Sequence, residues 1–195
     1  MIKIETHSPL IFRYDNAIDL DLCDQITEYI KIKSEQNDVK IEQGRMPWHD
    51  SDEEHFISIK DDAVKNGLLE YKNKVNSLIK LLYNEENLYP HFTDIVLWRE
   101  GREMPLHKDD GYDNDKHIYE CRHYTAVTYC NDDYVGGRTY VTNSNGGFYY
   151  SQPKKGSLLI FTSDERCLHG VEKVTEGQRV AVSIWFTRDE LKKEL

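Results

Sequence analysis

Apolar residues recur at helical spacing in the first half of the chain. One group predicts a first helix, preceded by the acidic residues that favour a helix start: Leu22, Cys23, Ile26, Tyr29 and Ile30. A second group advances by fours and threes as one stripe: Val64, Leu68, Tyr71, Val75, Leu78 and Leu82. Asp61 or Asp62 is the expected N-cap of this second helix. The stretch 43–58 between the two helices reads as irregular.

From about residue 91 the pattern changes to β-branched and aromatic runs separated by turn residues. The predicted strands are about 92–99, 121–130, 137–142, 147–151, 157–162, 170–174 and 178–187. Short strands at this spacing are typical of a sandwich or jelly roll. We therefore expect one α+β domain, in which a helical segment (1–90) buttresses a β core (91–195).

Composition excludes several functional classes. The 195 residues suit one domain, and 25 Lys+Arg against 35 Asp+Glu give a net charge of −10. A strongly acidic chain is a poor default binder of nucleic acid or of an anionic membrane. No apolar run approaches the length of a spanning helix, and the N-terminus lacks a signal-peptide pattern. We therefore expect a cytoplasmic protein whose four cysteines, without CxxC spacing, are mostly buried small hydrophobes.

The candidate chemistry begins at His107 and Asp109, which follow the first predicted strand of the β core. In an extended segment, residues two apart point to the same side. With the later His169 they could form the facial triad of non-haem Fe(II), which leaves coordination positions open. The HxD pattern alone is weak, because surface polar residues produce it readily.

Arg179 strengthens this interpretation because it opens the apolar strand Val180–Phe186. An arginine in a β core needs an anionic partner, since an unpaired buried charge is costly. A dicarboxylate that chelates the metal at its near end would supply that partner at its far end. The alternative is a structural salt bridge at the end of the strand.

Two longer motifs resemble a known family. The run Phe161-Thr-Ser-Asp-Glu-Arg-Cys-Leu-His169-Gly-Val-Glu-Lys-Val174, with Gly177-Gln-Arg179, is similar to the SDxRxxHxVxxV…GxR segment of hypoxia-sensing prolyl hydroxylases and their microbial relatives. The run from Arg122 to Asn131 resembles their R-x-x-T-x-x-x-Y-x-N strand. Over roughly residues 92–188 the chain thus looks like the prolyl 4-hydroxylase branch of the Fe(II)/2-oxoglutarate dioxygenases, which implies a double-stranded β-helix (jelly-roll) core.

The resemblance implies a role for each matching position. The iron ligands would be His107, Asp109 and His169. The cosubstrate 2-oxoglutarate would meet Arg179 and Tyr129 at its distal carboxylate, with Ser183 nearby. Arg122 and Trp185 would contact the substrate. Trp98 stands where the family usually has Tyr, and an indole donates but cannot accept a hydrogen bond, so this cosubstrate contact is expected to be rebuilt.

The implied function is hydroxylation of a prolyl residue in a peptide or protein, consuming O2 and releasing succinate and CO2. Ascorbate is an optional further cofactor. The presence of Asp109 favours hydroxylation over halogenation. Two alternatives stay open: the same chemistry on a free amino acid, a small metabolite or a nucleobase, and a β-helix binding module without turnover. The loop 110–116 and the region of Arg45, Trp48 and His49 are candidate substrate lids. The oligomeric state and the hydroxylated carbon are left open.

Overall fold

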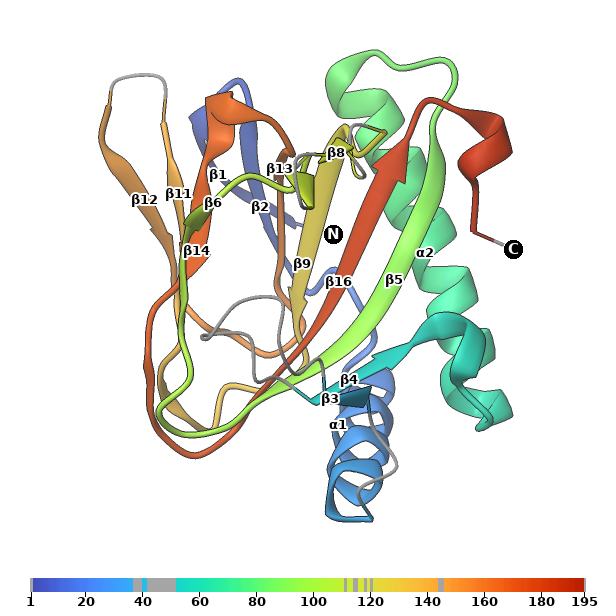
Figure 1. The fold of residues 1–195 in the computed structure, drawn as a ribbon, viewed down its shortest axis with the longest axis vertical. Coiled ribbons are helices and arrows are strands. Elements are labelled where there is room, and N and C mark those ends of the chain that lie inside the picture. Colours follow the sequence, from blue (N-terminus) through green and yellow to red (C-terminus); the bar gives the residue numbers. More distant parts are fainter. Residues whose placement is uncertain are drawn as a thin grey trace.

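The computed structural model describes residues 2–36, 40–41, 52–110, 112–113, 116–117, 119, 121–143 and 146–194. Two antiparallel sheets lie opposite each other (Figure 1). The larger sheet has the order β1 (Ile2–Ser8), β2 (Ile11–Asp15), β13 (Leu158–Thr162), β9 (Tyr124–Tyr129), β16 (Arg179–Thr187), β5 (Tyr89–Trp98), β4 (Asp52–His55), β3 (Lys40–Ile41). The smaller sheet has the order β12 (Phe148–Ser151), β11 (Thr139–Thr142), β14 (His169–Val171), β6 (Met104–His107). This arrangement confirms the predicted jelly roll.

Two short strand pairs and three 3-10 turns complete the described elements. β7 (Tyr112–Asp113) pairs with β8 (Lys116–His117), and β10 (Val135–Gly136) pairs with β15 (Val174–Glu176). The turns are η1 (Phe56–Ser58), η2 (Glu165–Cys167) and η3 (Glu190–Lys192). Of these elements, η2 bears directly on the site because it leads the chain into His169.

Both predicted helices form, as α1 (Leu20–Glu35) and α2 (Asp62–Tyr83). Asp61 is the N-cap of α2, since its carboxylate accepts a hydrogen bond from the Val64 N–H at 3.0 Å. The helix ends where Asn84 adopts the left-handed conformation, with φ of 55°. The apolar stripes of both helices pack on the outer face of the larger sheet, as Figure 1 shows for α2 behind β5 and β16.

Alternation along β16 divides the larger sheet into two faces. Val180, Val182, Ile184 and Phe186 join the core beneath the helices. The intervening positions face the space between the two sheets, where Ala181 joins a smaller apolar cluster with residues of β13 and β11. Arg179, Ser183 and Trp185 share the parity of Ala181, so β16 presents its predicted functional residues to the interior of the jelly roll.

The first ninety residues supply strands as well as helices. β2 lies next to β13 and β4 next to β5, so this segment extends the larger sheet in addition to covering it. Part of the stretch 43–58, expected to be irregular, forms β4 and η1, while residues 43–51 lie outside the described residues. The predicted strand 170–174 is two strands, β14 and β15. Residues 111, 114 and 115 of the candidate lid loop lie outside the described residues, as do Arg45, Trp48 and His49.

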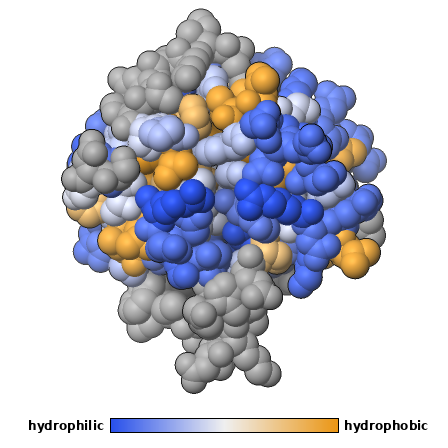
Figure 2. Space-filling model, turned by 90° about the horizontal axis from the view of Figure 1, so that it is seen from above, coloured by the Kyte–Doolittle hydropathy of each residue, from blue (hydrophilic) through white to orange (hydrophobic). Residues whose placement is uncertain are grey.

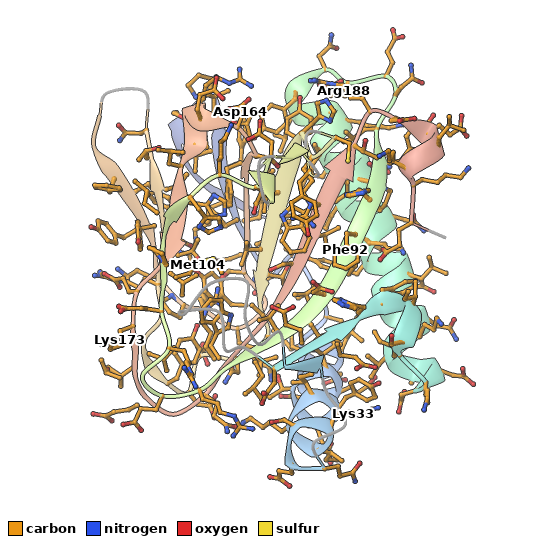
Figure 3. All side chains as sticks on the ribbon, in the orientation of Figure 1. Lys33, Phe92, Met104, Asp164, Lys173 and Arg188 are labelled. Atoms are coloured by element: carbon orange, nitrogen blue, oxygen red, sulfur yellow. The ribbon has the colours of Figure 1, made fainter. Side chains whose placement is uncertain are left out.

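The face seen from above is mostly hydrophilic, with separate hydrophobic areas (Figure 2). Figure 3 labels Asp164 and Arg188 at this upper end, and each belongs to an ion pair, with Arg166 and Glu85 respectively. Within the described residues, no helix is both long and apolar enough to cross a membrane.

Candidate metal centre and cosubstrate pocket

Strand pairing brings the three predicted metal ligands together. His107 ends β6, His169 begins β14, and antiparallel register places the two residues opposite each other. Asp109 follows His107 by two residues, and its carboxylate lies 3.3 Å from His169 Nε2 and 3.7 Å from His107 Nε2. One ligand atom from each residue falls within 4.8 Å of the others. Two imidazoles and one carboxylate on one side of a site are the donor set of a facial triad.

Both imidazoles are held with the same nitrogen toward Asp109. His107 Nδ1 lies 2.9 Å from the Pro105 carbonyl, and His169 Nδ1 lies 3.3 Å from the Cys167 carbonyl. A carbonyl only accepts, so Nδ1 carries the proton in each ring and the Nε2 lone pair is left for a metal. Burial lowers the pKa of His169 to about 4, which keeps its ring neutral at physiological pH, as a metal ligand requires.

Asp109 is buried and fixed by neighbours from two strands. Its Oδ2 accepts a 2.5 Å hydrogen bond from the Thr125 hydroxyl, and the Thr125 and Ser163 hydroxyls lie 2.8 Å apart. The Ser163 carbonyl also accepts the backbone N–H of Asp109 at 2.9 Å. Burial acts to raise the pKa of this carboxyl, but the neighbouring His169, His107 and Arg122, together with the hydrogen bond from Thr125, outweigh it. The pKa of Asp109 therefore lies below its usual value, and the group is an anion.

Arg179 is the largest fully buried side chain, with 2% exposure. Its Nη2 donates a 3.3 Å hydrogen bond to the Thr139 hydroxyl, and its Nε is buried without a partner. Within the described residues no carboxylate forms an ion pair with it; its charge lies near the faces of Tyr129 and Trp98, at 5.3 and 5.7 Å from the ring centroids. Arg179 therefore forms no structural salt bridge with the described residues, and its guanidinium is available to an anionic ligand.

A second arginine lies near the metal centre, where it interacts electrostatically with Asp109. The Arg122 guanidinium is stacked between two rings, 4.0 Å from the Tyr119 centroid and 4.2 Å from the Trp185 centroid. Arg122 Nε and Trp185 Nε1 are both buried donors without a partner. Two unpaired N–H groups in one place are costly unless an acceptor arrives, so this wall of the site is built to receive an oxygen atom.

Comparison with known proteins agrees with this geometry. Residues 93–187 match the family model of the 2OG-Fe(II) oxygenase superfamily, and this span holds the triad and Arg179. Residues 93–187 therefore form a 2OG-Fe(II) oxygenase domain. The cofactors of this domain are Fe(II), 2-oxoglutarate and O2.

Among curated relatives, the chain is 42% identical over 79 residues to prolyl 3-hydroxylase 2 of Rattus norvegicus, which is 40% of this chain and 11% of the relative. It is 40% identical over 73 residues to prolyl 3-hydroxylase 1 of Gallus gallus, 36% of this chain and 10% of the relative. The chain thus matches only about a tenth of the length of these relatives.

Solved structures share the fold across almost the whole chain. A Pseudomonas putida prolyl-4-hydroxylase superposes with a TM-score of 0.70 at 17% identity, covering 92% of both chains. A Trichoplax adhaerens prolyl hydroxylase, solved in complex with a hypoxia inducible factor peptide fragment, gives a TM-score of 0.73 at 17% identity, covering 95% of this chain and 86% of that one. These similarities extend the oxygenase fold to the N-terminal segment outside the family match.

The residues of the oxygenase domain fit its cofactors. The triad offers two neutral nitrogen donors and one anionic oxygen, which suit Fe(II). Arg179 offers a buried cation with an unpaired Nε, which suits the distal carboxylate of 2-oxoglutarate. Both groups lie on the interior side of the jelly roll.

Tyr129 is near Arg179, but its hydroxyl already makes two hydrogen bonds within the protein. It donates to the Ser151 carbonyl at 3.2 Å and accepts the Thr139 backbone N–H at 3.1 Å. The single phenolic proton would have to leave Ser151 to reach a carboxylate, and the 3.2 Å bond is long enough to be exchanged. The contact of Tyr129 with 2-oxoglutarate stays a prediction, and it requires that the hydroxyl exchange the Ser151 carbonyl for the carboxylate.

Trp98 and Ser183 lie on neighbouring strands of the larger sheet. Trp98 lies directly opposite Arg179 in strand register and presents its ring toward the guanidinium. The indole therefore covers the arginine with a π face, a contact that does not require the hydroxyl of the usual tyrosine. Ser183 is half-buried on the interior face of β16, between Val127 and Asp94 on its two neighbouring strands.

Sequence reasoning assigned no role to several residues that hold the site. Thr125 and Ser163 support Asp109, and Thr139 supports both Arg179 and Tyr129. Thr125 belongs to the R-x-x-T motif, so the sequence did mark this position. No sequence pattern marked Tyr119. Its contact with Arg122 depends on a local turn, which is closed by a 2.9 Å hydrogen bond from the Arg122 N–H to the Tyr119 carbonyl.

Proposed function

We propose that the protein hydroxylates a prolyl residue in a peptide or protein, with 2-oxoglutarate and O2 as cosubstrates and succinate and CO2 as co-products. The observation that carries this proposal is the presence of a facial triad and an unpaired buried arginine on the interior side of the jelly roll. Fe(II) with 2-oxoglutarate and O2 supplies the oxidising chemistry when bound.

The prolyl substrate is inferred from the relatives. Curated relatives are named prolyl 3-hydroxylases, one solved relative is named a prolyl-4-hydroxylase, and another, named a prolyl hydroxylase, holds a peptide fragment. The wall of Arg122 and Trp185 is consistent with such a substrate. Its two unpaired N–H donors suit the carbonyl oxygens of a peptide, and its rings offer a flat apolar surface to a pyrrolidine. The names of the relatives differ in the proline carbon that is hydroxylated, C3 or C4. Analysis of the product decides between these two positions.

The chain's own residues have distinct tasks in this reaction. His107, Asp109 and His169 hold the metal on one side and leave the remaining positions to ligands. Arg179 orients the cosubstrate through its distal carboxylate. Arg122 and Trp185 hold the substrate oxygen and the aliphatic ring in place.

The test is anaerobic titration with Fe(II) and 2-oxoglutarate, followed by assays on a library of prolyl peptides. We expect a visible charge-transfer band in the wild type that is lost in Asp109→Ala, then succinate formation coupled to a peptide gaining one oxygen atom. Amino-acid analysis identifies 3- or 4-hydroxyproline. Succinate formation with free amino acids, metabolites or nucleobases but no peptide would replace the proposed substrate. Absence of metal binding would leave only a binding module.

Two finer expectations belong to this proposal. Cys23, Cys121, Cys130 and Cys167 are free thiols, and the first, third and fourth are buried, which supports a reducing, cytoplasmic compartment. Dependence on ascorbate is tested by following turnover number with and without it. Fractionation of cells expressing the tagged protein tests the location.

A further inference from the structure

A buried histidine–aspartate pair lies on the interior face of the larger sheet, and the proposed reaction does not use it. Asp94 on β5 is opposite His55 on β4 and Ser183 on β16 in strand register. His55 Nδ1 hydrogen-bonds Asp94 Oδ1, and Asp94 is 4% exposed. A carboxylate this deeply buried is costly unless positive charge lies nearby.

Packed rings connect this pair to the substrate wall. The His55 ring lies 4.8 Å from the Phe92 ring, and the Phe92 ring lies 6.0 Å from the Trp185 ring, measured between centroids. The Arg122 guanidinium then lies over Trp185. Figure 3 labels Phe92 on β5, next to β16, which carries Trp185. The His–Asp pair and Arg122 therefore border one continuous aromatic surface.

Arg122 lacks a direct counter-ion. Within the described residues its guanidinium forms no hydrogen bond or ion pair, and its polar contacts are the faces of Tyr119, Trp185 and Phe92. Burial lowers the pKa of Arg122, and the carboxylates that oppose this shift are Asp109 and Asp94. A divalent cation held by the triad would take up the charge of Asp109. Asp94 is then the carboxylate left to balance the guanidinium.

We infer that Asp94, held by His55, is a positioning residue that keeps the Arg122 guanidinium against Trp185, where it faces the substrate. The electrostatic attraction acts across the aromatic surface without a direct salt bridge, so the Arg122 donors stay free for a substrate oxygen. The positioning of Arg122 is a property of the folded chain; its effect on substrate affinity rests on the proposed function.

The first test needs no substrate. The Nε–H signal of Arg122, assigned with Arg122→Lys, is followed by ¹⁵N NMR hydrogen exchange in Asp94→Asn. We expect exchange to become about tenfold faster as the side chain loses its fixed place. Glu54→Gln is the matched control, because Glu54 is a buried carboxylate on β4 whose bond to the Tyr29 hydroxyl lies on the helix side. An unchanged exchange rate in Asp94→Asn overturns the inference.

The second test is a double-mutant cycle on a prolyl peptide that the wild type hydroxylates. Asp94→Asn is expected to raise KM for the peptide about tenfold with little change in kcat, and about twofold or less in an Arg122→Gln background. Asp94→Glu should restore part of the affinity, and Glu54→Gln should keep the wild-type KM. Equal effects in both backgrounds show that Asp94 acts independently and overturn the inference. If no prolyl peptide is hydroxylated, the proposed function fails, and the exchange measurement alone decides the role of Asp94.

Discussion

His107 and His169 are opposite partners in an antiparallel strand pair, and their ring centroids lie 4.3 Å apart. This pairing explains how residues 62 positions apart in the chain converge on one metal site. The pairing of β6 with β14 fixes the position of the rings, and the carbonyls two residues earlier, of Pro105 in β6 and Cys167 in η2, fix the tautomer by accepting Nδ1–H. The metal site is therefore prepared by the backbone of the smaller sheet, and Asp109 completes it.

Removing the hydroxyl that holds Asp109 should weaken metal binding without unfolding the protein. In Thr125→Val the 2.5 Å hydrogen bond to Asp109 Oδ2 is lost, while the volume of the side chain is kept. Loss of such support around a metal ligand typically costs about 10- to 100-fold in affinity. We expect a fall of that size in Fe(II) affinity, measured by anaerobic competition with a chelating dye.

Thr128→Val on the same strand is the control for this measurement. Thr128 is equally buried, but its hydroxyl bonds the Tyr71 hydroxyl at 2.7 Å on the helix side of the sheet. Thr128→Val should lower the free energy of unfolding by about 1 kcal/mol and leave Fe(II) affinity unchanged. Equal metal affinities in the two variants would contradict a supporting role for Thr125.

Replacing Arg179 should separate stability from cosubstrate binding. Arg179 is buried with an unpaired Nε, so its charge is not compensated until an anion binds. Arg179→Met removes that charge at similar volume, and replacing poorly compensated buried charges by apolar groups is often neutral or stabilising by about 1 to 4 kcal/mol. We expect the variant to have an equal or higher Tm than the wild type in the absence of 2-oxoglutarate.

The same variant should lose its response to the cosubstrate. Addition of 2-oxoglutarate with a divalent metal should raise the Tm of the wild type, while Arg179→Met should bind 2-oxoglutarate at least about tenfold more weakly by calorimetry. Metal affinity alone should be preserved. A marked loss of Tm in the cosubstrate-free variant would show that Arg179 is chiefly a structural residue.

Sequence patterns predicted the elements that bury one apolar face. The stripes of α1 and α2 and the runs of β9, β13 and β16 are visible because each repeats at the period of its element. β4 was invisible, since Asp52, Glu53 and Glu54 are charged yet buried. Asp52 pairs with Arg99 at 2.7 Å, a partner 47 residues away, so its burial is a tertiary property.

The site was predictable to the same extent. His107, Asp109, His169 and Arg179 carry motifs, and the structure places all four on interior surfaces of the jelly roll. The residues that support them come from other strands and show no spacing of their own. His55 is an example, because its bond to Asp94 depends on the pairing of β4 with β5. Tertiary pairing, which local patterns do not encode, created these contacts.

A buried ion pair ties the end of the chain to α2. Lys72 Nζ lies 2.9 Å from Glu194 Oε2, with side-chain exposures of 2% and 5%, and the ammonium sits over the Phe56 ring at 3.5 Å. Thr93 donates two further hydrogen bonds to the same carboxylate, at 3.0 and 2.7 Å. Glu194→Ala would leave a buried ammonium uncompensated, and such losses cost about 3 to 5 kcal/mol.

Urea unfolding measures this cost, with Glu190→Ala as the control. Glu190 forms an exposed pair with Lys193 at 3.3 Å, and exposed pairs contribute about 0 to 1 kcal/mol. We expect the midpoint of Glu194→Ala to fall far below that of Glu190→Ala, without a change in m-value. Similar midpoints would show that water reaches Lys72 in the native state.

His91 should make stability depend on pH in the weakly acidic range. Burial, followed by the charges of Arg122 and Lys192, lowers the pKa of His91 to about 4, against about 6.5 in an unfolded chain. As pH falls below about 6.5, His91 is protonated in the unfolded state but stays neutral in the folded state. The free energy of unfolding therefore decreases until about pH 4. This loss of stability is absent above about pH 6.5, where His91 is neutral in both states.

His91→Gln should remove this part of the pH dependence. We expect the difference in free energy of unfolding between pH 7 and pH 5 to be smaller in the variant than in the wild type, measured by urea titration at both pH values. The sign is decisive, because a histidine stabilised as a cation by a carboxylate would gain stability over the same range. His91 has its Nε2 3.6 Å from Cys121 Sγ and a buried Nδ1 without a partner, so no such carboxylate contacts it in the described structure. A larger loss of stability in His91→Gln at pH 5 than at pH 7 would mean that the imidazolium is the form the fold prefers.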